Sequence, residues 1–212
     1  GLGLPITALI NDMSEVLGRT AGNALEILET VQYLKGEFKE PRLHRVVVDL
    51  GAELLVLSKL SPTLEDAVAK MEESLSSGRA SEYFSRMVSA LGGPSDFMDR
   101  PEHYLDAAPI IIPVHALQSG TVNLIDTRSV GNAVVELGGG RRLVEDIVDP
   151  AVGLSEVLGL GEQAGPDRPL AMLHARDQKS ADAAISRLQA AFTIGEEANF
   201  TRPDVILERI QH

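Results

Sequence analysis

Apolar residues recur at a helical period through the first half of the chain. Between residues 23 and 91 they return every three or four positions, and glycine or proline follows each run. The short apolar run Leu4–Ile10 comes before them, and its length and its flanking glycine predict a buried strand. The periodic runs predict helices at Asn23–Lys35, Arg42–Lys59, Thr63–Ser76 and Ala80–Leu91.

The pattern changes after a polar stretch, Pro94–Ala107, that contains two prolines. Beyond it, short runs typical of strands alternate with helical ones, and the first two strands are expected to pair as a hairpin. We therefore expect a mainly helical region at residues 1–95, a linker at 96–107 and an α+β unit at 108–212. The helices predicted in this unit are Thr127–Leu137 and Ser180–Phe192, and the strands are Ile110–Val114, Gly120–Ile125, Leu154–Leu160, Leu170–His174 and Val205–Ile210.

The composition of the chain excludes several classes of protein. The chain has 19 basic and 31 acidic residues and a formal net charge of −12, which repels nucleic acids and anionic membrane surfaces. Its apolar runs are far too short to span a bilayer. It contains no cysteine, which excludes disulfides and thiolate zinc sites and fits a reducing cytoplasm. We therefore expect a cytoplasmic protein with no nucleic-acid partner and no membrane partner.

Most of the conspicuous glycine, histidine and arginine positions favour structural roles. The glycines of Gly159–Gly165 have the wrong spacing for a dinucleotide-binding loop, and no predicted helix follows them. No two of the five histidines have the spacing of metal ligands, and His174, at the end of a predicted strand, is expected to be packed. Gly138–Arg142 (GGGRR) could bind an anion or could end a helix, where glycine and basic residues are both favoured. The helix end is the favoured interpretation.

The segment Val16–Glu29 (VLGRTAGNALEILE) combines a loop of small residues with the start of a predicted helix. Backbone carbonyls in such a loop can converge on a hard cation, and a carboxylate can complete the site. Glu26 and Glu29 are three positions apart, so both can face one site. The alternative is that both are ordinary acids near a helix N-terminus, where the helix dipole stabilises them. The residues alone favour this alternative.

Several motifs, in a fixed order along the chain, resemble those of pyrimidine nucleoside phosphorylases. The loop and helix start at Leu17–Glu26 (LGRTAGNALE) resemble one such segment, and Ala8–Met13 resembles the strand and turn that lead into it. The likeness covers essentially the whole chain. It continues downstream with Asp126–Arg128, Gly131, Val134–Arg142, Asp149–Gly153 and Pro169–Ala175.

The resemblance implies a fold and a reaction. Residues 1–95 would be a remnant of the large α/β domain, of glycosyltransferase type, and residues 108–212 the compact C-terminal α+β domain. The reaction would be the reversible phosphorolysis of thymidine to thymine and 2-deoxy-α-D-ribose 1-phosphate in pyrimidine salvage, carried out by a homodimer. The phosphate- and base-binding motifs lie upstream in the family, so no catalytic or substrate-binding residue is expected in this chain.

The resemblance also implies a structural monovalent cation, potassium, and no organic cofactor. By matching position, its ligands would be the main-chain carbonyls of Leu17 and Thr20 and the side chain of Glu29. The remaining ligands in the family come from the phosphate-binding segment. We expect the chain alone to be inactive. We also expect it to self-associate, because a parallel sheet without its partner strands leaves edges and apolar faces exposed.

Two alternatives stay open. A related phosphorylase could act on uridine or on a nucleoside monophosphate, since the base pocket that sets specificity lies outside these motifs. A non-catalytic binding module could reuse the fold, as carrier domains do. A carrier domain needs an exposed lysine in a tight hairpin, and no lysine occurs between Lys70 and Lys179, which argues against this second alternative.

Overall fold

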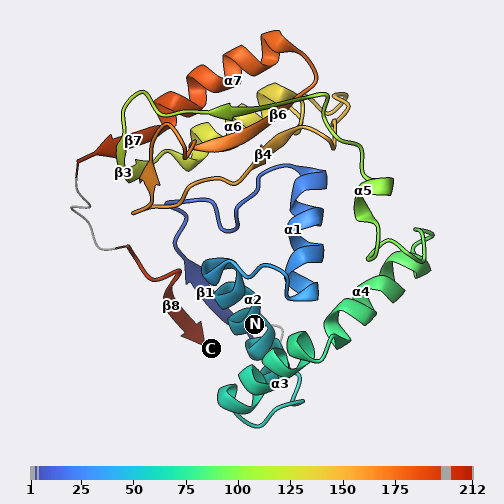
Figure 1. Cartoon of the computed structure of the whole chain (residues 1–212). Helices are drawn as coiled ribbons and strands as arrows, with labels where there is room; N and C mark the ends of the chain where they lie inside the picture. The colour runs from blue at the N-terminus through green and yellow to red at the C-terminus, as the bar shows by residue number, and fades with distance from the viewer. Residues whose placement is uncertain (1–2, 4, 197–201, 212) are drawn as a thin grey trace. The chain divides into compact units, whose positions relative to one another are not determined.

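The computed structural model describes residues 3, 5–196 and 202–211, which belong to two compact units (Figure 1). Unit 1 comprises residues 1–12, 31–99 and 203–212, and unit 2 comprises residues 13–30 and 100–202. Helix α1 (Asn23–Lys35) begins in unit 2 and ends in unit 1. The family domains expected at residues 1–95 and 108–212 stay a prediction, because the compactness of a unit does not define a family domain.

Unit 1 contains the helices predicted between residues 42 and 91, with ends shifted by one or two residues. Helix α2 (Pro41–Leu57) starts with proline, where the helix needs no backbone N–H. Thr63 caps α3 (Leu64–Ser76), because its hydroxyl accepts a hydrogen bond from the amide of Asp66. Helix α4 (Arg79–Ala90) then follows Gly78, which has a left-handed backbone conformation.

The sheet of unit 1 joins the two ends of the described chain. Strand β1 (Thr7–Asn11) pairs antiparallel with β8 (Ile206–Gln211), and Arg209 of β8 forms a bidentate ion pair with Glu53 of α2. The prediction of a buried strand at Leu4–Ile10 is wrong about burial. Side chains of β1 alternate between half-buried and exposed, since β8 is its only partner among the described strands. The pairing of β1 with β8 is antiparallel, whereas the resemblance implied a parallel sheet. Leu4, the first residue of the predicted strand, lies outside the described residues.

Helix α4 carries an exposed apolar stripe. Tyr83, Met87 and Leu91 follow one another at intervals of four positions and are 65%, 49% and 81% exposed. No residue of α4 is buried. The guanidinium of Arg86 lies 5.2 Å from the centroid of the Tyr83 ring, at the edge of this stripe. An apolar stripe of this kind usually covers another element, so it is a candidate surface for association.

Unit 2 contains two three-stranded antiparallel sheets and two long helices. One sheet has the order β2-β6-β4 and the other the order β5-β3-β7. Asp126 and Asp177 cap the two long helices by accepting hydrogen bonds from the amides of Ser129 and Ser180. The elements are α5 (Pro101–Tyr104), β2 (Ile110–Val114), β3 (Gly120–Ile125), α6 (Thr127–Leu137), β4 (Gly153–Ser155), β5 (Gln163–Ala164), β6 (Ala171–Ala175), α7 (Gln178–Ala191) and β7 (Phe192–Gly195).

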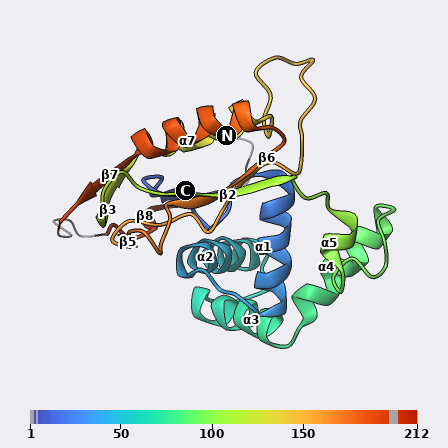
Figure 2. The same cartoon turned by 45° about the horizontal axis from the view of Figure 1, so that its top comes forward.

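The core of unit 2 lies between these sheets and helices. Leu154 and Leu173, on the paired strands β4 and β6, are fully buried with Leu188 of α7. Ala133 of α6 and Ala184 of α7 are also fully buried, and their small side chains let the two helices pack closely. Figure 2 shows α7 lying along β2 and β6. Each buried leucine contributes roughly 1.5–3 kcal/mol, so this core holds the unit together.

Two strand predictions in unit 2 are wrong. The first two strands form no hairpin, because β2 pairs with β6 and β3 pairs with β5 and β7 in the other sheet. The strand predicted at Leu154–Leu160 ends at Ser155, because Glu156 has a left-handed backbone conformation (φ +53°) that turns the chain. The apolar residues after this turn are buried without belonging to a strand. Alternating apolar residues indicate burial, but they do not select a partner strand.

Candidate functional site

The carboxylate of Glu29 lies against the loop that precedes α1. Glu29 is 7% exposed. Its Oε1 accepts a hydrogen bond from the amide of Arg19 at 2.7 Å, and its Oε2 accepts one from the hydroxyl of Thr20 at 2.5 Å. A Cβ atom at Gly18 would lie only 2.5–2.8 Å from the Glu29 carboxylate, so the carboxylate needs glycine at this position. The structure thus brings Glu29 into contact with Thr20, but through the Thr20 hydroxyl and not through the carbonyl predicted as a ligand, and Leu17 lies exposed three positions before Thr20.

Glu26 has a different role from Glu29. Its Oε1 accepts a hydrogen bond from the amide of Gly22 at 3.0 Å, which satisfies a backbone donor at the start of the helix. Glu26 is therefore an ordinary N-terminal acid, as the favoured interpretation held, and Glu29 is not. The two side chains do not serve one common site.

The carbonyl groups of the loop fall into two sets. Those of Arg19 and Ala21 accept hydrogen bonds from the amides of Val157 (3.0 Å) and Leu154 (2.8 Å). Within the described part of the chain, the carbonyls of Leu17 and Thr20 accept no such backbone hydrogen bond. These two carbonyl oxygens and the Glu29 carboxylate are hard oxygen donors, the type of ligand that hard cations prefer. The described residues contain no group of three or more His, Cys, Asp or Glu that could hold a metal ion.

The loop is attached to β4 by backbone contacts on both sides. The amide of Ala21 donates to the carbonyl of Leu154 at 2.9 Å, which completes a bridge with the bond in the other direction. Two glycines allow this close approach. A Cβ atom at Gly22 would lie 2.6 Å from the carbonyl oxygen of Val152, and one at Gly153 would collide with the carbonyl oxygen of Ala21. The loop therefore belongs structurally to the sheet of unit 2.

A half-buried ion pair joins the loop to the segment that follows β4. The guanidinium of Arg19 pairs with both carboxylate oxygens of Glu162, and its Nη1 also donates to the carbonyl of Val157 at 3.2 Å. Glu162 accepts further hydrogen bonds from the amide of Gly159 at 2.6 Å and from Arg168 at 2.6 Å. Burial raises the pKa of Glu162, but these hydrogen bonds and positive charges outweigh it and hold the pKa below its usual value.

A second buried carboxylate, Glu15, lies beside this pair. Its side chain is completely buried, and Arg202 donates to both of its oxygens at 2.8 Å. Its Oε2 also accepts a hydrogen bond from the amide of Leu160 at 2.9 Å. A Cβ atom at Gly159 would meet Glu15 at 2.7 Å and Arg202 at 2.9 Å, so glycine is needed where the two ion pairs meet. Buried charges that are fully paired in this way specify one arrangement of the segments that carry them.

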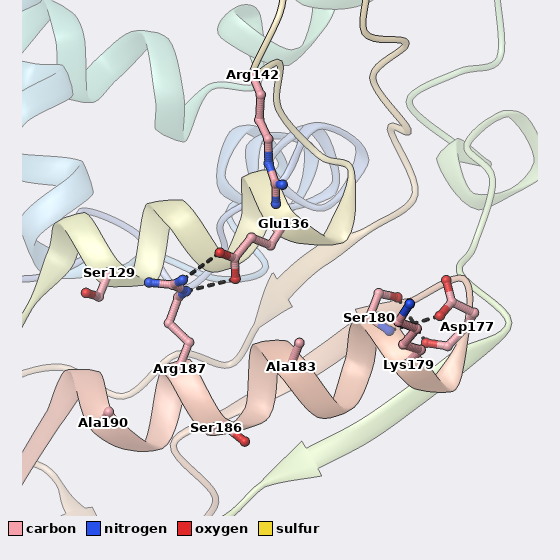
Figure 3. A pocket seen from close by; sticks show the side chains of 10 residues that line it. All are labelled: Ser129, Glu136, Arg142, Asp177, Lys179, Ser180, Ala183, Ser186, Arg187 and Ala190. Carbon is pink, nitrogen blue, oxygen red and sulfur yellow. Dashed lines mark hydrogen bonds and ion pairs between the residues drawn. The ribbon is translucent and has the colours of Figure 1, made fainter.

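The groove between α6 and α7 is lined by polar and charged side chains, which include the ion pair of Arg187 with Glu136 (Figure 3). It has a volume of about 900 Å³ and is widely open. Arg187 forms a bidentate pair with Glu136, at 2.8 and 2.5 Å, and Figure 3 shows Arg142 pointing toward the same carboxylate. Gly138, with φ +99°, ends α6 just before this region, so Gly138–Arg142 is a helix end as expected. We assign no ligand to this groove.

Two histidines have structural partners. His174 of β6 is 9% exposed and shares a hydrogen bond with Ser155 at 2.9 Å, which confirms it as packed. In unit 1, His44 connects Tyr33 of α1 to Glu72 of α3, at 2.9 and 2.7 Å. Burial and the charge of Glu72 raise the pKa of Tyr33 to about 12, so Tyr33 stays protonated at neutral pH. These groups hold helices together and are not suited to act as nucleophiles or bases.

Arg19 and Glu162 were not singled out from the sequence. They are separated by 143 positions. A single arginine inside a loop of otherwise small residues was a usable signal for Arg19. Nothing in the residues around Glu162 distinguishes it from other exposed acids.

Comparisons with known proteins agree with this architecture. Residues 121–195 match the family model described as the pyrimidine nucleoside phosphorylase C-terminal domain. The chain is 46% identical over 213 residues to thymidine phosphorylase of Agrobacterium fabrum, an alignment that covers 99% of this chain and 48% of the relative. The chain therefore spans about half the length of the curated relative it matches. In the described part of the chain, no helix is long and apolar enough to cross a membrane. The ordered motifs and the mixed fold agree with these two matches: residues 121–195 match the C-terminal domain of pyrimidine nucleoside phosphorylases, and the chain is similar over nearly its whole length to about half of a thymidine phosphorylase.

Proposed function

We propose that the chain is part of a thymidine phosphorylase, which converts thymidine and phosphate reversibly to thymine and 2-deoxy-α-D-ribose 1-phosphate. The observation that carries this proposal is the 46% identity to a thymidine phosphorylase over 99% of the chain. Phosphate would displace the base from the sugar, and the enzyme would hold both substrates in a cleft. The complete enzyme would act as a homodimer in the cytoplasm, in pyrimidine salvage.

The part that this chain plays is to support the site rather than to form it. By resemblance, the residues that hold phosphate and base lie in family segments outside the motifs found here. In the groove between α6 and α7, Arg187 is paired with Glu136, and Asp177 accepts a hydrogen bond from the amide of Ser180 as a helix cap. The chain alone would therefore not turn over thymidine.

The cation proposal assigns a role to the loop before α1. The carbonyls of Leu17 and Thr20 and the carboxylate of Glu29 would hold a potassium ion, which would supply a fixed positive charge beside the loop. Support comes from the hydrogen bond of the Thr20 hydroxyl to Glu29, which places Thr20 beside that carboxylate, and from the hydrogen bonds that occupy the carbonyls of Arg19 and Ala21. No organic cofactor is proposed.

Phosphate-dependent release of thymine tests the proposed reaction. The chain is assayed alone and after mixing with the N-terminal half of the Agrobacterium fabrum relative as a second chain. We expect no turnover alone and measurable turnover of thymidine in the mixture. Turnover by the chain alone would contradict its proposed supporting role. Uridine and thymidine monophosphate are assayed in parallel, and a preference for either would favour a phosphorylase of different specificity.

A further inference from the structure

We propose that Arg19 and Glu162 are a positioning pair that sets the affinity of the Glu29 loop for its cation. This inference rests on the cation site proposed above and extends it to two residues outside the ligand set. Arg19 lies between the proposed carbonyl ligands Leu17 and Thr20 in sequence. Its own contacts decide how the peptide groups on either side are turned.

Arg19 is held at its amide, its carbonyl and both terminal nitrogens of its guanidinium. Its amide donates to Glu29 Oε1 at 2.7 Å, and its carbonyl accepts from the amide of Val157 at 3.0 Å. Its guanidinium pairs with Glu162 and donates to the carbonyl of Val157. A residue held in this way cannot rotate without breaking several bonds. The carbonyl of Arg19 is thereby turned toward Val157, and the Thr20 carbonyl beside it is left for a ligand.

Glu162 is a rigid anchor for this arrangement. Its side chain is 20% exposed, and it accepts hydrogen bonds from the amide of Gly159 and from Arg168 in addition to those from Arg19. These two contacts hold the Glu162 carboxylate in place independently of Arg19. The loop therefore owes part of its shape to a residue in the family's C-terminal domain, 143 positions downstream.

The pair also has an electrostatic consequence. The amide of Arg19 already contacts Glu29, so its guanidinium is attached close to the one carboxylate of the proposed site. Without Glu162, the guanidinium would lose this ion pair and could turn toward Glu29 and compete with a monovalent cation for it. The ion pair with Glu162 keeps the Arg19 guanidinium from competing with the cation for Glu29. Outer partners that orient metal ligands typically change metal affinity by about tenfold or more, and we expect a change of that size here.

Hydrogen–deuterium exchange and thermal unfolding of the 212-residue chain, mixed with the N-terminal half of the Agrobacterium fabrum relative, test the proposal, because the remaining cation ligands are expected in that half. Both are measured in potassium chloride and in tetramethylammonium chloride at equal ionic strength, which separates potassium binding from screening. We compare wild type with Glu162→Gln and with a control, Glu136→Gln, which removes the similar bidentate pair with Arg187 away from the loop. We expect Glu162→Gln to speed exchange of the loop before α1 in both salts. We also expect it to raise by about tenfold the potassium concentration that gives half of the thermal stabilisation.

A double variant, Arg19→Gln with Glu162→Gln, separates positioning from simple structural support. The double variant lacks the competing Arg19 guanidinium, so it should bind potassium more tightly than the single variant Glu162→Gln. Neither variant retains the ion pair between Arg19 and Glu162. A double variant that binds potassium more weakly than the single variant would overturn the competition argument. Unchanged loop exchange in Glu162→Gln would overturn the positioning role even if potassium stabilises the wild type. If Glu162→Gln speeds exchange of the loop but potassium does not stabilise the wild type, the proposed cation site is refuted. The proposed effect of the Arg19–Glu162 pair on cation affinity is then refuted as well.

Discussion

Glu26 and Glu29 show how two acids of the same type on one helix acquire different roles. The carboxylate of Glu26 satisfies the amide of Gly22, within the same turn of chain. The carboxylate of Glu29 is buried against Gly18 and Thr20, nine or more positions away in sequence. A one-turn offset is enough to move a carboxylate from the helix start to the face that meets the loop. Only the second position can contribute charge to a cation site.

His174 is predicted to stay neutral at neutral pH. Its burial lowers its pKa below the usual 6.5, and the nearby charge of Glu156 opposes this only in part. Because the folded state favours the neutral form, His174 contributes stability above pH 6.5, and this contribution is lost as the pH falls through its lowered folded pKa. NMR titration of the histidine ring signals, with His174→Gln for assignment, measures this pKa. Titration of His174 at or above 6.5 would contradict the prediction.

Tyr33 is predicted to ionise near pH 12. Burial and the charge of Glu72 disfavour the tyrosinate, so the stability that Tyr33 contributes is present below pH 10 and is lost as the pH rises toward about 12. The chain has three tyrosines and no tryptophan, which makes ultraviolet titration of tyrosinate feasible. The variant Tyr33→Phe should remove the highest step of the titration. If that step persists in the variant, it belongs to another tyrosine.

At the scale of elements, the backbones of the loop before α1 and of strand β4 lie so close together that only glycine fits at the point of contact. The bridge between Ala21 and Leu154 brings the backbone at Gly22 and Gly153 together. Helices in this chain were predicted well, because their caps and apolar spacing are local features. Strand partners were not predicted, because pairing depends on contacts between distant segments. The hairpin wrongly predicted between β2 and β3 and the early end of β4 at Ser155 follow from this difference.

The variant Gly153→Ala is expected to destabilise unit 2 by at least about 2 kcal/mol. Gly153 has φ +151°, and its added Cβ would collide with the carbonyl oxygen of Ala21. Gly131→Ala is the matched control. Gly131 lies inside α6 with no heavy atom within 4 Å of an added Cβ, so alanine should stabilise by about 0.5–1 kcal/mol. Urea unfolding of both variants measures the difference, and equal stabilities would contradict the close approach.

At the scale of the whole molecule, the exposed stripe on α4 is predicted to promote self-association. Tyr83, Met87 and Leu91 form an apolar surface on a chain whose net charge of −12 otherwise opposes contact between copies. Sedimentation velocity over a range of protein concentrations, at moderate salt, should show association for wild type. Met87→Glu should reduce it. Ser89→Glu adds the same charge to a different face of the helix and should have a smaller effect. Equal effects of both variants would indicate that charge alone governs association.

The sequence by itself determined the order and type of most elements, the family resemblance, and the three residues proposed to hold a cation. Helical periodicity, caps and ordered motifs are properties of short stretches, so they can be recognised without knowing which stretches meet. The tertiary structure decided which strands pair, which of Glu26 and Glu29 faces the loop, and that Arg19 meets Glu162. These features depend on contacts between segments far apart in the sequence, such as Glu15 and Arg202, which lie 187 positions apart. The physical reason is that burial and pairing select such contacts only when the whole unit has packed.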